Sequence, residues 1–600
     1  MAKIIETDVL VVGSGPAGSA AAALLSSYGV KNIQISKYGS LADTPRAHIT
    51  NQRTMEVLRD LGIEDAAKQY SSHQDLMANN VFCYSLSGEE FGRILSWGNH
   101  PARKADYELA SPTQICDLPQ TFLEPILFET AVSRGTSARF NNEFVDLRQD
   151  ADAVTATVKD RLTGEQYEIR CQYLVGADGG KSRVAESIGL PMEGQMGLSG
   201  SMNILFDADL SKYVAHRPSV LYWILQPGAN IGGVGAGVIR MVRPWNQWLA
   251  IWGYDISQGE MKLTDEKAET ILRSLIGDND VPLKIRSTST WTVNNMYASQ
   301  YSVGRVFCLG DAVHRHPPLN GLGSNTSVQD AFNLAWKLKY VLAGQADRSL
   351  LETYSTERQP VGKQIVTRAN KSMADYPPIF DALGLLSSSD PEKVNAAIVG
   401  RKDATHEGKA RRRKLNEALQ QKNYEFNTRG VELNQRYKSA AVFGDGTAEP
   451  AYSRDSELYY QATTWPGAHL PHVWVEHQGK RKSTLDLCGR GRFTLLTGIG
   501  GECWRDAVAA VEERFGVSVD LMSIGPAGCD ALDIYADWYW QSEVEEDGCV
   551  LVRPDMHVAW RSAVAIEDPA ATLVNVFAKI LGRPLAAPVE SRQAQREMVG

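Results

Sequence analysis

Gly13-Ser14-Gly15-Pro16-Ala17-Gly18 is the stretch that decides the fold of this chain. A β-branched apolar run at 8–12 comes directly before it, which predicts a strand buried on both faces. An alanine-rich segment at 16–28 predicts a helix that ends at Gly29, and 33–35 predicts a second strand. The sequence therefore predicts a βαβ unit near the N-terminus.

A bound dinucleotide would explain the glycines of this loop. Gly13 permits a tight turn, Gly15 lets the backbone approach a pyrophosphate, and Gly18 allows close packing of helix against strand. The helix that begins with Pro16 and Ala17 would direct its free N–H groups at the anion. We predict that all five residues bind a dinucleotide; a purely structural turn is the alternative.

The loop alone does not distinguish NAD from FAD. An acidic residue usually ends the second strand and binds the adenosine ribose, but this chain has Ser36-Lys37 there. The Ser36 hydroxyl can still hydrogen-bond a sugar hydroxyl, and Lys37 could reach a phosphate. Both residues are predicted cofactor ligands.

Two later segments each place an aspartate, Asp178 or Asp311, just after an apolar strand. Such a carboxylate can accept hydrogen bonds from hydroxyl groups. The glycine-rich turn after Asp311 leads into a helix expected from about Ser327 to Leu342, whose N-terminus would stabilise an anionic reduced flavin. FAD is therefore favoured. Beyond the two aspartates, we predict flavin contacts from Gly310, Pro318, Gly321, Leu322, Gly323, Ser324 and Asn325.

The remaining chain shows further patterns. Residues 200–255 carry short strands at 220–225, 232–237 and 248–252, which predicts an antiparallel sheet over a pocket. The charged run 400–414 predicts a solvated helix face. We predict an α/β protein with an FAD-binding domain at 1–190 and 291–375, a substrate-binding antiparallel sheet at 191–290, a helical connector at 376–450 and a C-terminal domain at 451–600.

Composition excludes several classes of protein. Apolar residues make up 43%, charged residues 22%, and the net charge is -9, which argues against nucleic-acid or anionic-membrane partners. The sequence has no secretory signal and no apolar stretch of membrane-spanning length. Its eight cysteines include no CxxC pair, so we expect reduced thiols in a cytoplasmic protein.

The three cofactor segments together resemble the class A flavoprotein aromatic hydroxylases, the phenol hydroxylase family. The chain is most similar to the 2,4-dichlorophenol 6-monooxygenases, and the 2-hydroxybiphenyl 3-monooxygenases are close relatives. The resemblance implies that Arg46 and Gln120 contact FAD, that Asp311 holds the ribityl chain, and that the C-terminal domain is thioredoxin-like. It rests on Pro45–Thr54, Ser219–Trp223, Arg240–Asn246, Asp311–Pro318 and Arg492–Gly498.

The resemblance also implies a reaction. A tightly bound FAD, reduced by NAD(P)H, would react with O2 to a C4a-hydroperoxide that ortho-hydroxylates a substituted phenol of the chlorophenol type to a catechol. The protein must supply a base, because a phenolate ring is more electron-rich, and a dry pocket. His48 is the predicted base, as in the 2-hydroxybiphenyl relatives; a structural histidine is the alternative.

Aromatic side chains would suit the walls of such a pocket. Arg240 or Arg243 could guide the nicotinamide, with a surface ion pair as the alternative. His314 and His316 lack a third ligand at suitable spacing, so we predict no metal and a role in ordering their loop. The predicted substrate contacts are Trp97, Tyr222, Trp223, Trp291, Pro318 and Leu319, although ordinary core positions would explain each.

Other functions stay open at this point. A 2-hydroxybiphenyl-type enzyme, a flavin oxidoreductase of another class such as a halogenase, and a non-enzymatic FAD-binding protein are the alternatives. The halogenase signature is not found. Relatives imply a homodimer or homotetramer, and neither the ring substituents nor the choice between NADH and NADPH follows from the sequence.

Overall fold

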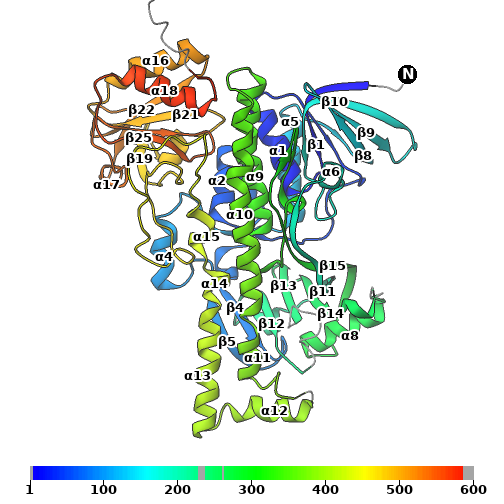
Figure 1. Cartoon of the computed structure of the whole chain (residues 1–600). Helices are drawn as coiled ribbons and strands as arrows, with labels where there is room; N and C mark the ends of the chain where they lie inside the picture. Colours follow the sequence, from blue (N-terminus) through cyan, green and yellow to red (C-terminus); the bar gives the residue numbers. More distant parts are fainter. Residues whose placement is uncertain (1–3, 228–236, 260–262, 389, 585–600) are drawn as a thin grey trace, which may run out of the picture.

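The computed structural model describes residues 4–227, 237–259, 263–388 and 390–584. Within these residues, three large sheets and one two-stranded ladder organise the chain. The sheets lie in three separate parts of the molecule, with the long helices α9 (Gly323–Leu342) and α10 (Ser349–Ala374) between them (Figure 1). No helix in these ranges is long and apolar enough to cross a membrane.

The first sheet contains the predicted βαβ unit. β1 (Ile4–Val12) and β2 (Asn32–Ile35) are parallel and are joined by α1 (Pro16–Ser27). The helix ends as expected, because Gly29 adopts the left-handed conformation at φ 78°. β10 (Gln166–Gly176) pairs with β1 on its other side, and β17 (Val306–Cys308) pairs with β10, both in parallel. The carboxyl ends of β1, β10 and β17 therefore meet at one edge, where parallel sheets usually bind ligands.

The second sheet is antiparallel over most of its width. Its long central pair is β11 (Met192–Asp207) and β15 (Lys284–Ala298). β4 (Asn79–Cys83) and β5 (Glu90–Leu95) also belong to it, because β4 pairs in parallel with β12 (Ser219–Ile224). The expected division at residue 190 therefore cuts through this sheet. Most of the strand expected at 232–237 lies outside the described residues. The other strands are β13 (Gly237–Arg243), β14 (Gln247–Tyr254) and β18 (His314–Arg315).

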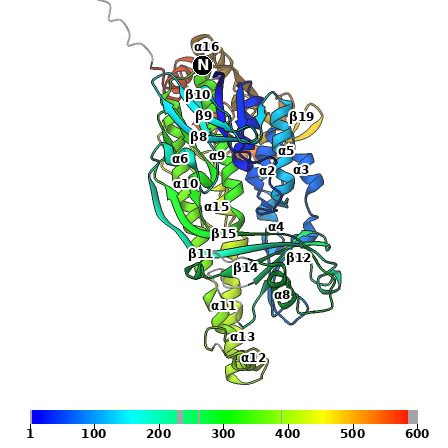
Figure 2. The ribbon, with the colours of Figure 1, turned by 90° about the vertical axis from the view of Figure 1, so that its right-hand side faces the viewer.

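Two long helices connect the parts of the molecule. α10 runs alongside α9 and continues toward the second sheet (Figure 2). α9 begins at Gly323, four residues before the expected start, so the last glycine of the turn forms its first residue. The helix thereby places its N-terminus at the carboxyl edge of the first sheet.

A helical arm follows α10. α11 (Pro377–Ala382), α12 (Pro391–Gly400) and α13 (His406–Gln421) extend away from the body of the molecule (Figure 1). The charged run 400–414 lies largely on α13, and several of its side chains form ion pairs, such as Arg411 with Glu407. This agrees with the expected solvated helix face.

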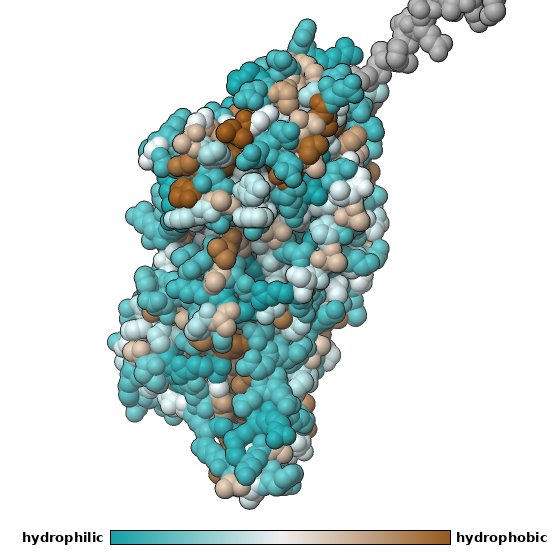
Figure 3. Space-filling view, turned by 90° about the vertical axis from the view of Figure 1, so that its left-hand side faces the viewer, coloured by the Kyte–Doolittle hydropathy of each residue, from teal (hydrophilic) through white to brown (hydrophobic). Residues whose placement is uncertain are grey.

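The C-terminal unit has its own seven-stranded mixed sheet, in the order β20-β19-β23-β22-β21-β24-β25. Its described part is α/β, as expected; a thioredoxin-like fold stays a prediction. Viewed from the side on which the C-terminal unit lies, the surface is mostly hydrophilic, with hydrophobic side chains in small separate patches (Figure 3). The elements are β19 (Trp474–His477), β20 (Lys480–Ser483), β21 (Phe493–Thr497), β22 (Val519–Gly525), β23 (Ala531–Asp533), β24 (Cys549–Val552), β25 (Val558–Ser562), α16 (Cys503–Phe515), α17 (Asp537–Gln541) and α18 (Pro569–Ile580).

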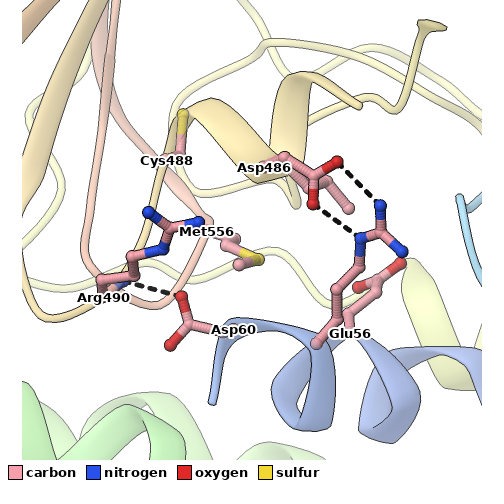
Figure 4. Close-up of a pocket in the computed structure, with 8 residues that line it drawn as sticks. Glu56, Asp60, Asp486, Cys488, Arg490 and Met556 are labelled. Atoms are coloured by element: carbon pink, nitrogen blue, oxygen red, sulfur yellow. Dashed lines mark hydrogen bonds and ion pairs between the residues drawn. The ribbon is translucent and has the colours of Figure 1, made fainter. Parts of the chain in front are cut away.

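Charged side chains join this unit to α2 (Gln52–Asp60). Arg59 donates two hydrogen bonds to the Asp486 carboxylate, at 2.6 and 2.8 Å (Figure 4). Asp60 accepts a hydrogen bond from the backbone N–H of Arg490, and burial raises the pKa of Asp60 to about 7. We call this contact the α2 seam; it also includes a His469–Glu56 pair with its atoms 3.0 Å apart.

Candidate active site

The glycine loop after β1 is packed as a pyrophosphate site requires. A Cβ on Gly13 would collide with the Ala177 carbonyl, and one on Gly18 would collide with the Gly13 carbonyl. A Cβ on Gly15 would have only one atom within 4 Å, a Glu124 carboxylate oxygen at 3.9 Å. The chain is thus tight around the loop but open above Gly15, where no side chain caps α1.

The adenosine end of the expected cofactor site is less regular. Ser36 is buried, and its hydroxyl accepts a hydrogen bond of 2.9 Å from the Ser14 hydroxyl. Lys37 is exposed, with its ammonium group 5.3 Å from the Tyr38 ring centroid. Both residues lie at the end of β2 beside the glycine loop, which is where a ribose and its phosphate would need them.

The two predicted aspartates make different contacts in the structure. Asp178 accepts hydrogen bonds from the Ser182 hydroxyl and, at 2.7 Å, from the Arg183 backbone N–H. It therefore stabilises the start of the short helix α6 (Arg183–Ser187). Asp311 is exposed at the end of β17, and its carboxylate makes no hydrogen bond to any described residue. Asp311 is thus free to bind the hydroxyl groups of a ligand.

The third segment meets the first at Gly310. A Cβ at this position would come within 2.9 Å of both the Ala17 Cβ and the Ser327 hydroxyl. The N-terminus of α9 is nearby, and no side chain caps it. Free N–H groups at a helix start favour an anionic group. Together with the open loop at Gly15, this geometry fits FAD.

Asn325 ties this helix start to the chain around His48. Its side-chain N–H groups donate to the Ile49 carbonyl at 2.8 Å and to the Gly321 carbonyl at 2.6 Å. Its side-chain oxygen accepts from the Asn51 backbone N–H at 2.9 Å. The predicted flavin ligand Asn325 therefore also fixes the predicted base relative to α9.

His48 is paired with a carboxylate that the sequence did not single out. Its Nδ1 lies 2.7 Å from Asp117 Oδ1, and Asp117 is fully buried while the His48 side chain is 14% exposed. The ladder of β3 (Ile49–Thr50) and β6 (Cys116–Asp117) brings them together, and Leu118 N–H donates to the His48 carbonyl at 2.6 Å. The sequence could have pointed to Asp117, because it is an aspartate inside the apolar run Ile115–Leu118.

The surroundings keep His48 neutral. Burial and the positive charge of Arg240 lower the pKa of His48 to about 4, although its hydrogen bond to Asp117 acts in the opposite direction. At neutral pH the Nδ1–H therefore donates to Asp117, and Nε2 keeps its lone pair. This arrangement can accept a proton at Nε2 and stabilise the resulting imidazolium.

The loop that carries Arg46 is fastened by α5 (Gln120–Ser133). The Gln120 side-chain oxygen accepts from the Ala47 N–H at 3.3 Å, and its amide donates to Glu124 at 2.5 Å. Glu124 accepts in turn from the Ala42 N–H at 2.9 Å. Arg46 itself is exposed. Gln120 thus orders the loop, and the Arg46 side chain is left available to a ligand.

An aromatic cluster lies in the same hydrophobic core as Ile49 and Leu319. The Trp223 ring is 4.8 Å from that of Tyr376 and 6.4 Å from that of Phe426. The Trp223 indole N–H is buried and has no hydrogen-bond partner among the described residues. Tyr376 and Phe426 were not predicted, because both belong to the helical connector.

Two matches to known families cover most of the chain. Residues 6–369 match the family of FAD binding domains, and residues 463–584 match the C-terminal domain of aromatic-ring hydroxylases. This chain belongs to the FAD-dependent aromatic-ring hydroxylases. The predicted family and its cofactor are thereby confirmed, and FAD, NAD(P)H and O2 are the reagents of the hydroxylase.

Similar proteins support this assignment. The hydroxylase is 57% identical over 561 residues to 2,4-dichlorophenol 6-monooxygenase of Delftia acidovorans, covering 94% of this chain and 96% of the relative. It is 49% identical over 577 residues to phenol 2-monooxygenase of a Pseudomonas species, covering 96% and 93%. The crystal structure of the flavin-dependent monooxygenase PieE with FAD and substrate is 46% identical, with a TM-score of 0.93 over 97% of this chain and all of PieE.

Several predicted pocket residues of the hydroxylase lie apart from the aromatic cluster around Trp223. Tyr222 is on the opposite face of β12, where its hydroxyl donates to the Arg217 carbonyl at 3.0 Å. Trp291 is on β15 and donates to the Asn203 side chain at 3.2 Å. Pro318 is exposed beside the start of α9. Trp97 does belong to the cluster, because its ring packs 5.9 Å from that of Phe426.

The two predicted nicotinamide arginines are placed differently. Arg240 is 1% exposed and donates to the carbonyls of Pro45 and Arg46, so it is not part of a surface ion pair. Arg243 donates to the Tyr70 carbonyl at 2.8 Å and stacks 3.8 Å from the Phe122 ring centroid. Arg240 therefore supports the loop before His48 from beneath, whereas Arg243 is nearer the surface.

The histidines after Asp311 order their loop, as expected. His314 is fully buried with its Nε2 3.0 Å from Asp330. His316 Nδ1 lies 2.6 Å from the Pro317 carbonyl. Each imidazole is thus engaged within the protein.

Proposed function

We propose that this hydroxylase adds one oxygen atom of O2 ortho to the hydroxyl group of a substituted phenol of the chlorophenol type, which gives a catechol. NAD(P)H supplies the electrons. The proposal is supported by the names of the relatives, which include two 2,4-dichlorophenol 6-monooxygenases at 57% and 56% identity. A 2-hydroxybiphenyl is the alternative substrate, because its enzymes share most of the motif stretches.

The single observation that carries the proposal is the His48–Asp117 pair at 2.7 Å. A phenol has a pKa near 10, far above the pKa of about 4 for His48. Ground-state transfer of the phenolic proton is therefore unfavourable. Transfer becomes favourable as the ring loses electrons during hydroxylation, when the phenolic proton moves to His48 Nε2 and Asp117 stabilises the imidazolium.

The proposed cofactor contacts follow the three segments. FAD, once reduced and reacted with O2, supplies the electrophilic oxygen. The pyrophosphate would lie on Gly13–Gly18, the adenosine by Ser36 and Lys37, and the ribityl chain by Asp311. Arg46, Gln120 and Asp178 would support the flavin, with Gly310, Pro318 and Gly321–Asn325 at its ring. Trp97, Trp223 and Leu319 would contact the substrate and exclude water.

Purified holoenzyme tests the function directly. We expect 2,4-dichlorophenol to stimulate NADH or NADPH oxidation under air and to yield the dichlorocatechol in nearly stoichiometric amount. Its methyl ether, 2,4-dichloroanisole, is the matched control, because it has no proton for His48 to accept and should give no catechol. Stimulated oxidation that produces only H2O2 would rule out chlorophenol as substrate. A higher kcat/KM for 2-hydroxybiphenyl would favour the alternative.

We further propose that the hydroxylase is a cytoplasmic homodimer or homotetramer. The free thiols of its eight cysteines support a reducing compartment. Light scattering coupled to size-exclusion chromatography measures the oligomeric mass, and a monomer at micromolar concentration would contradict this proposal.

A further inference from the structure

The Asp117 carboxylate is held from two sides. Its Oδ1 lies 2.7 Å from His48 Nδ1, and its Oδ2 accepts a hydrogen bond of 2.8 Å from the Ser72 hydroxyl. Ser72 makes a second contact, because its backbone N–H donates to the Asp117 carbonyl at 2.9 Å. Ser72 is 7% exposed and Asp117 is fully buried. The serine therefore lies inside the site, in the connection after α3 (Glu64–Tyr70).

A competing cation lies close to the same carboxylate. Burial lowers the pKa of Arg240 to about 10, and the negative charge of Asp117 acts in the opposite direction. Arg240 uses Nη1 for the carbonyls of Pro45 and Arg46, whereas its buried Nε and Nη2 have no acceptor among the described residues. These N–H groups would gain strong, charge-assisted hydrogen bonds if the Asp117 carboxylate turned toward them. Asp117 therefore has two possible nitrogen donors, the neutral imidazole of His48 and the guanidinium of Arg240.

We propose that Ser72 is a positioning residue that holds the Asp117 carboxylate on His48 and prevents it from turning to Arg240. This inference rests on the proposed role of His48 as the base. Two hydrogen bonds fix the orientation of the carboxylate, one at each oxygen. Without the Ser72 hydroxyl, Oδ2 loses its donor and the carboxylate can rotate toward the free guanidinium N–H groups.

No bond breaks at Ser72 during the reaction. The phenolic proton moves from the substrate oxygen to His48 Nε2, and the Nδ1–H of the imidazolium remains hydrogen-bonded to Asp117. The Ser72 O–H donates to Asp117 before and after this transfer. The serine thus affects how easily the bound phenol loses its proton, which a merely structural serine would not.

The experiment measures catechol formation across pH, because the phenolic proton moves to His48 only during hydroxylation. Holoenzyme is assayed with NAD(P)H, O2 and 2,4-dichlorophenol, and the pH at which kcat rises gives an apparent pKa, which moves toward that of the free phenol when no base assists the reaction. We expect His48→Ala to raise this pKa relative to wild type. We expect Ser72→Ala to raise it in the same direction and to lower kcat at pH 7 about tenfold, with recovery as pH approaches the phenol's own pKa.

Matched variants keep the proposal falsifiable. Ser72→Thr retains the hydroxyl and should behave like wild type; if it matches Ser72→Ala, steric fit and not the hydrogen bond is responsible and the proposal fails. If Ser72→Ala does not retain FAD, Ser72→Cys decides in its place, because a thiol of similar size is a weak donor.

The outcomes separate this inference from the proposed function. An unchanged pKa in His48→Ala overturns both the base and the role of Ser72. A raised pKa in His48→Ala with a wild-type value in Ser72→Ala, or in Ser72→Cys where that variant decides, overturns only the role of Ser72.

Discussion

Two of the buried histidine–carboxylate pairs in the described residues have nearly the same geometry but different surroundings. His48 and Asp117 are 2.7 Å apart near the start of α9, and His469 and Glu56 are 3.0 Å apart in the α2 seam. The carboxylates differ in their other contacts. Each accepts from a serine hydroxyl, Ser111 for Glu56 and Ser72 for Asp117. Glu56 accepts in addition from Arg53 at 3.0 Å.

We expect this difference to separate a structural pair from a reactive one. Burial alone would raise the pKa of Glu56, but His469 and Arg53 lower it to about 2, so its charge is already balanced in the resting fold. Among the residues that the structure describes, no arginine donates a hydrogen bond to Asp117, so in the proposed mechanism its negative charge is available to a cation that forms on His48 during turnover. The residue beside the carboxylate, more than the histidine, distinguishes the two sites.

The largest effect is expected at the seam. Glu56→Gln leaves the buried Arg53 without its carboxylate, which should reduce the free energy of unfolding by about 3–5 kcal/mol. Urea denaturation of the holoenzyme measures this loss. Glu168→Gln is the control, because its ion pair with Arg148 lies at the surface and should contribute little to stability. Equal losses in both variants would contradict the structural role of Glu56.

His48→Ala should affect chemistry and spare the fold. We expect catechol formation at pH 7 to fall about 100-fold or more, because the phenolic proton loses its acceptor. The FAD content and the urea midpoint should stay near those of wild type. Coupled assays of NAD(P)H oxidation and catechol yield measure the effect, and wild-type turnover would refute the base role.

The two pairs should also lose stability in different pH windows. His48 has a folded pKa of about 4, below its ordinary 6.5, so protonation favours the unfolded chain and stability falls as pH drops from 6.5 toward 4. Glu56 loses its contribution from pH 4.5 toward 2. Relative to wild type, His48→Ala should reduce the slope of the free energy of unfolding against pH between 6.5 and 4 by up to about 1.4 kcal/mol per pH unit. Glu56→Gln should reduce the same slope between pH 4.5 and 2. Urea midpoints across pH test this, and identical windows would contradict it.

The smallest effect concerns neighbouring residues on β12. Trp223→Phe removes the buried indole N–H, and we expect KM for the phenol to rise about threefold to tenfold if this group binds substrate. Tyr222→Phe removes the hydrogen bond to Arg217 on the other face and should lower stability by about 1 kcal/mol without changing KM. A similar KM change in both variants would show that the effect arises from a disturbance of β12 and not from loss of the indole N–H.

Local patterns located the segments that meet at the carboxyl edge of the first sheet, but not the contacts around His48. The glycine loop, Asp311 and the α9 start are defined by residues adjacent in sequence, and the structure brings them together. Asp117 is 69 residues from His48 and reaches it only through the two-residue ladder of β3 and β6. No local periodicity encodes such a ladder.

Other differences between the predictions from sequence and the structure also arise from contacts between distant parts of the chain. Arg240 was predicted to guide the nicotinamide or to form a surface ion pair, yet it is buried, and backbone carbonyls of a distant loop accept hydrogen bonds from its guanidinium. β4 and β5 join the second sheet although most of its strands come more than 100 residues later. Tyr222 and Trp223 could have been separated from sequence alone, because neighbouring residues on a strand face opposite sides.

Helix α9 has a consequence for recombining this protein with its relatives. Its first turn lies at the carboxyl edge of the first sheet, while Trp336 near its other end is fully buried against Phe493 of the C-terminal unit. Beside Trp336, Lys337 and Arg553 share the Glu357 carboxylate of α10. A chimera that exchanges only the C-terminal unit would therefore sever a charge cluster and expose a tryptophan. Productive crossovers should carry α9 and α10 together with the unit they support.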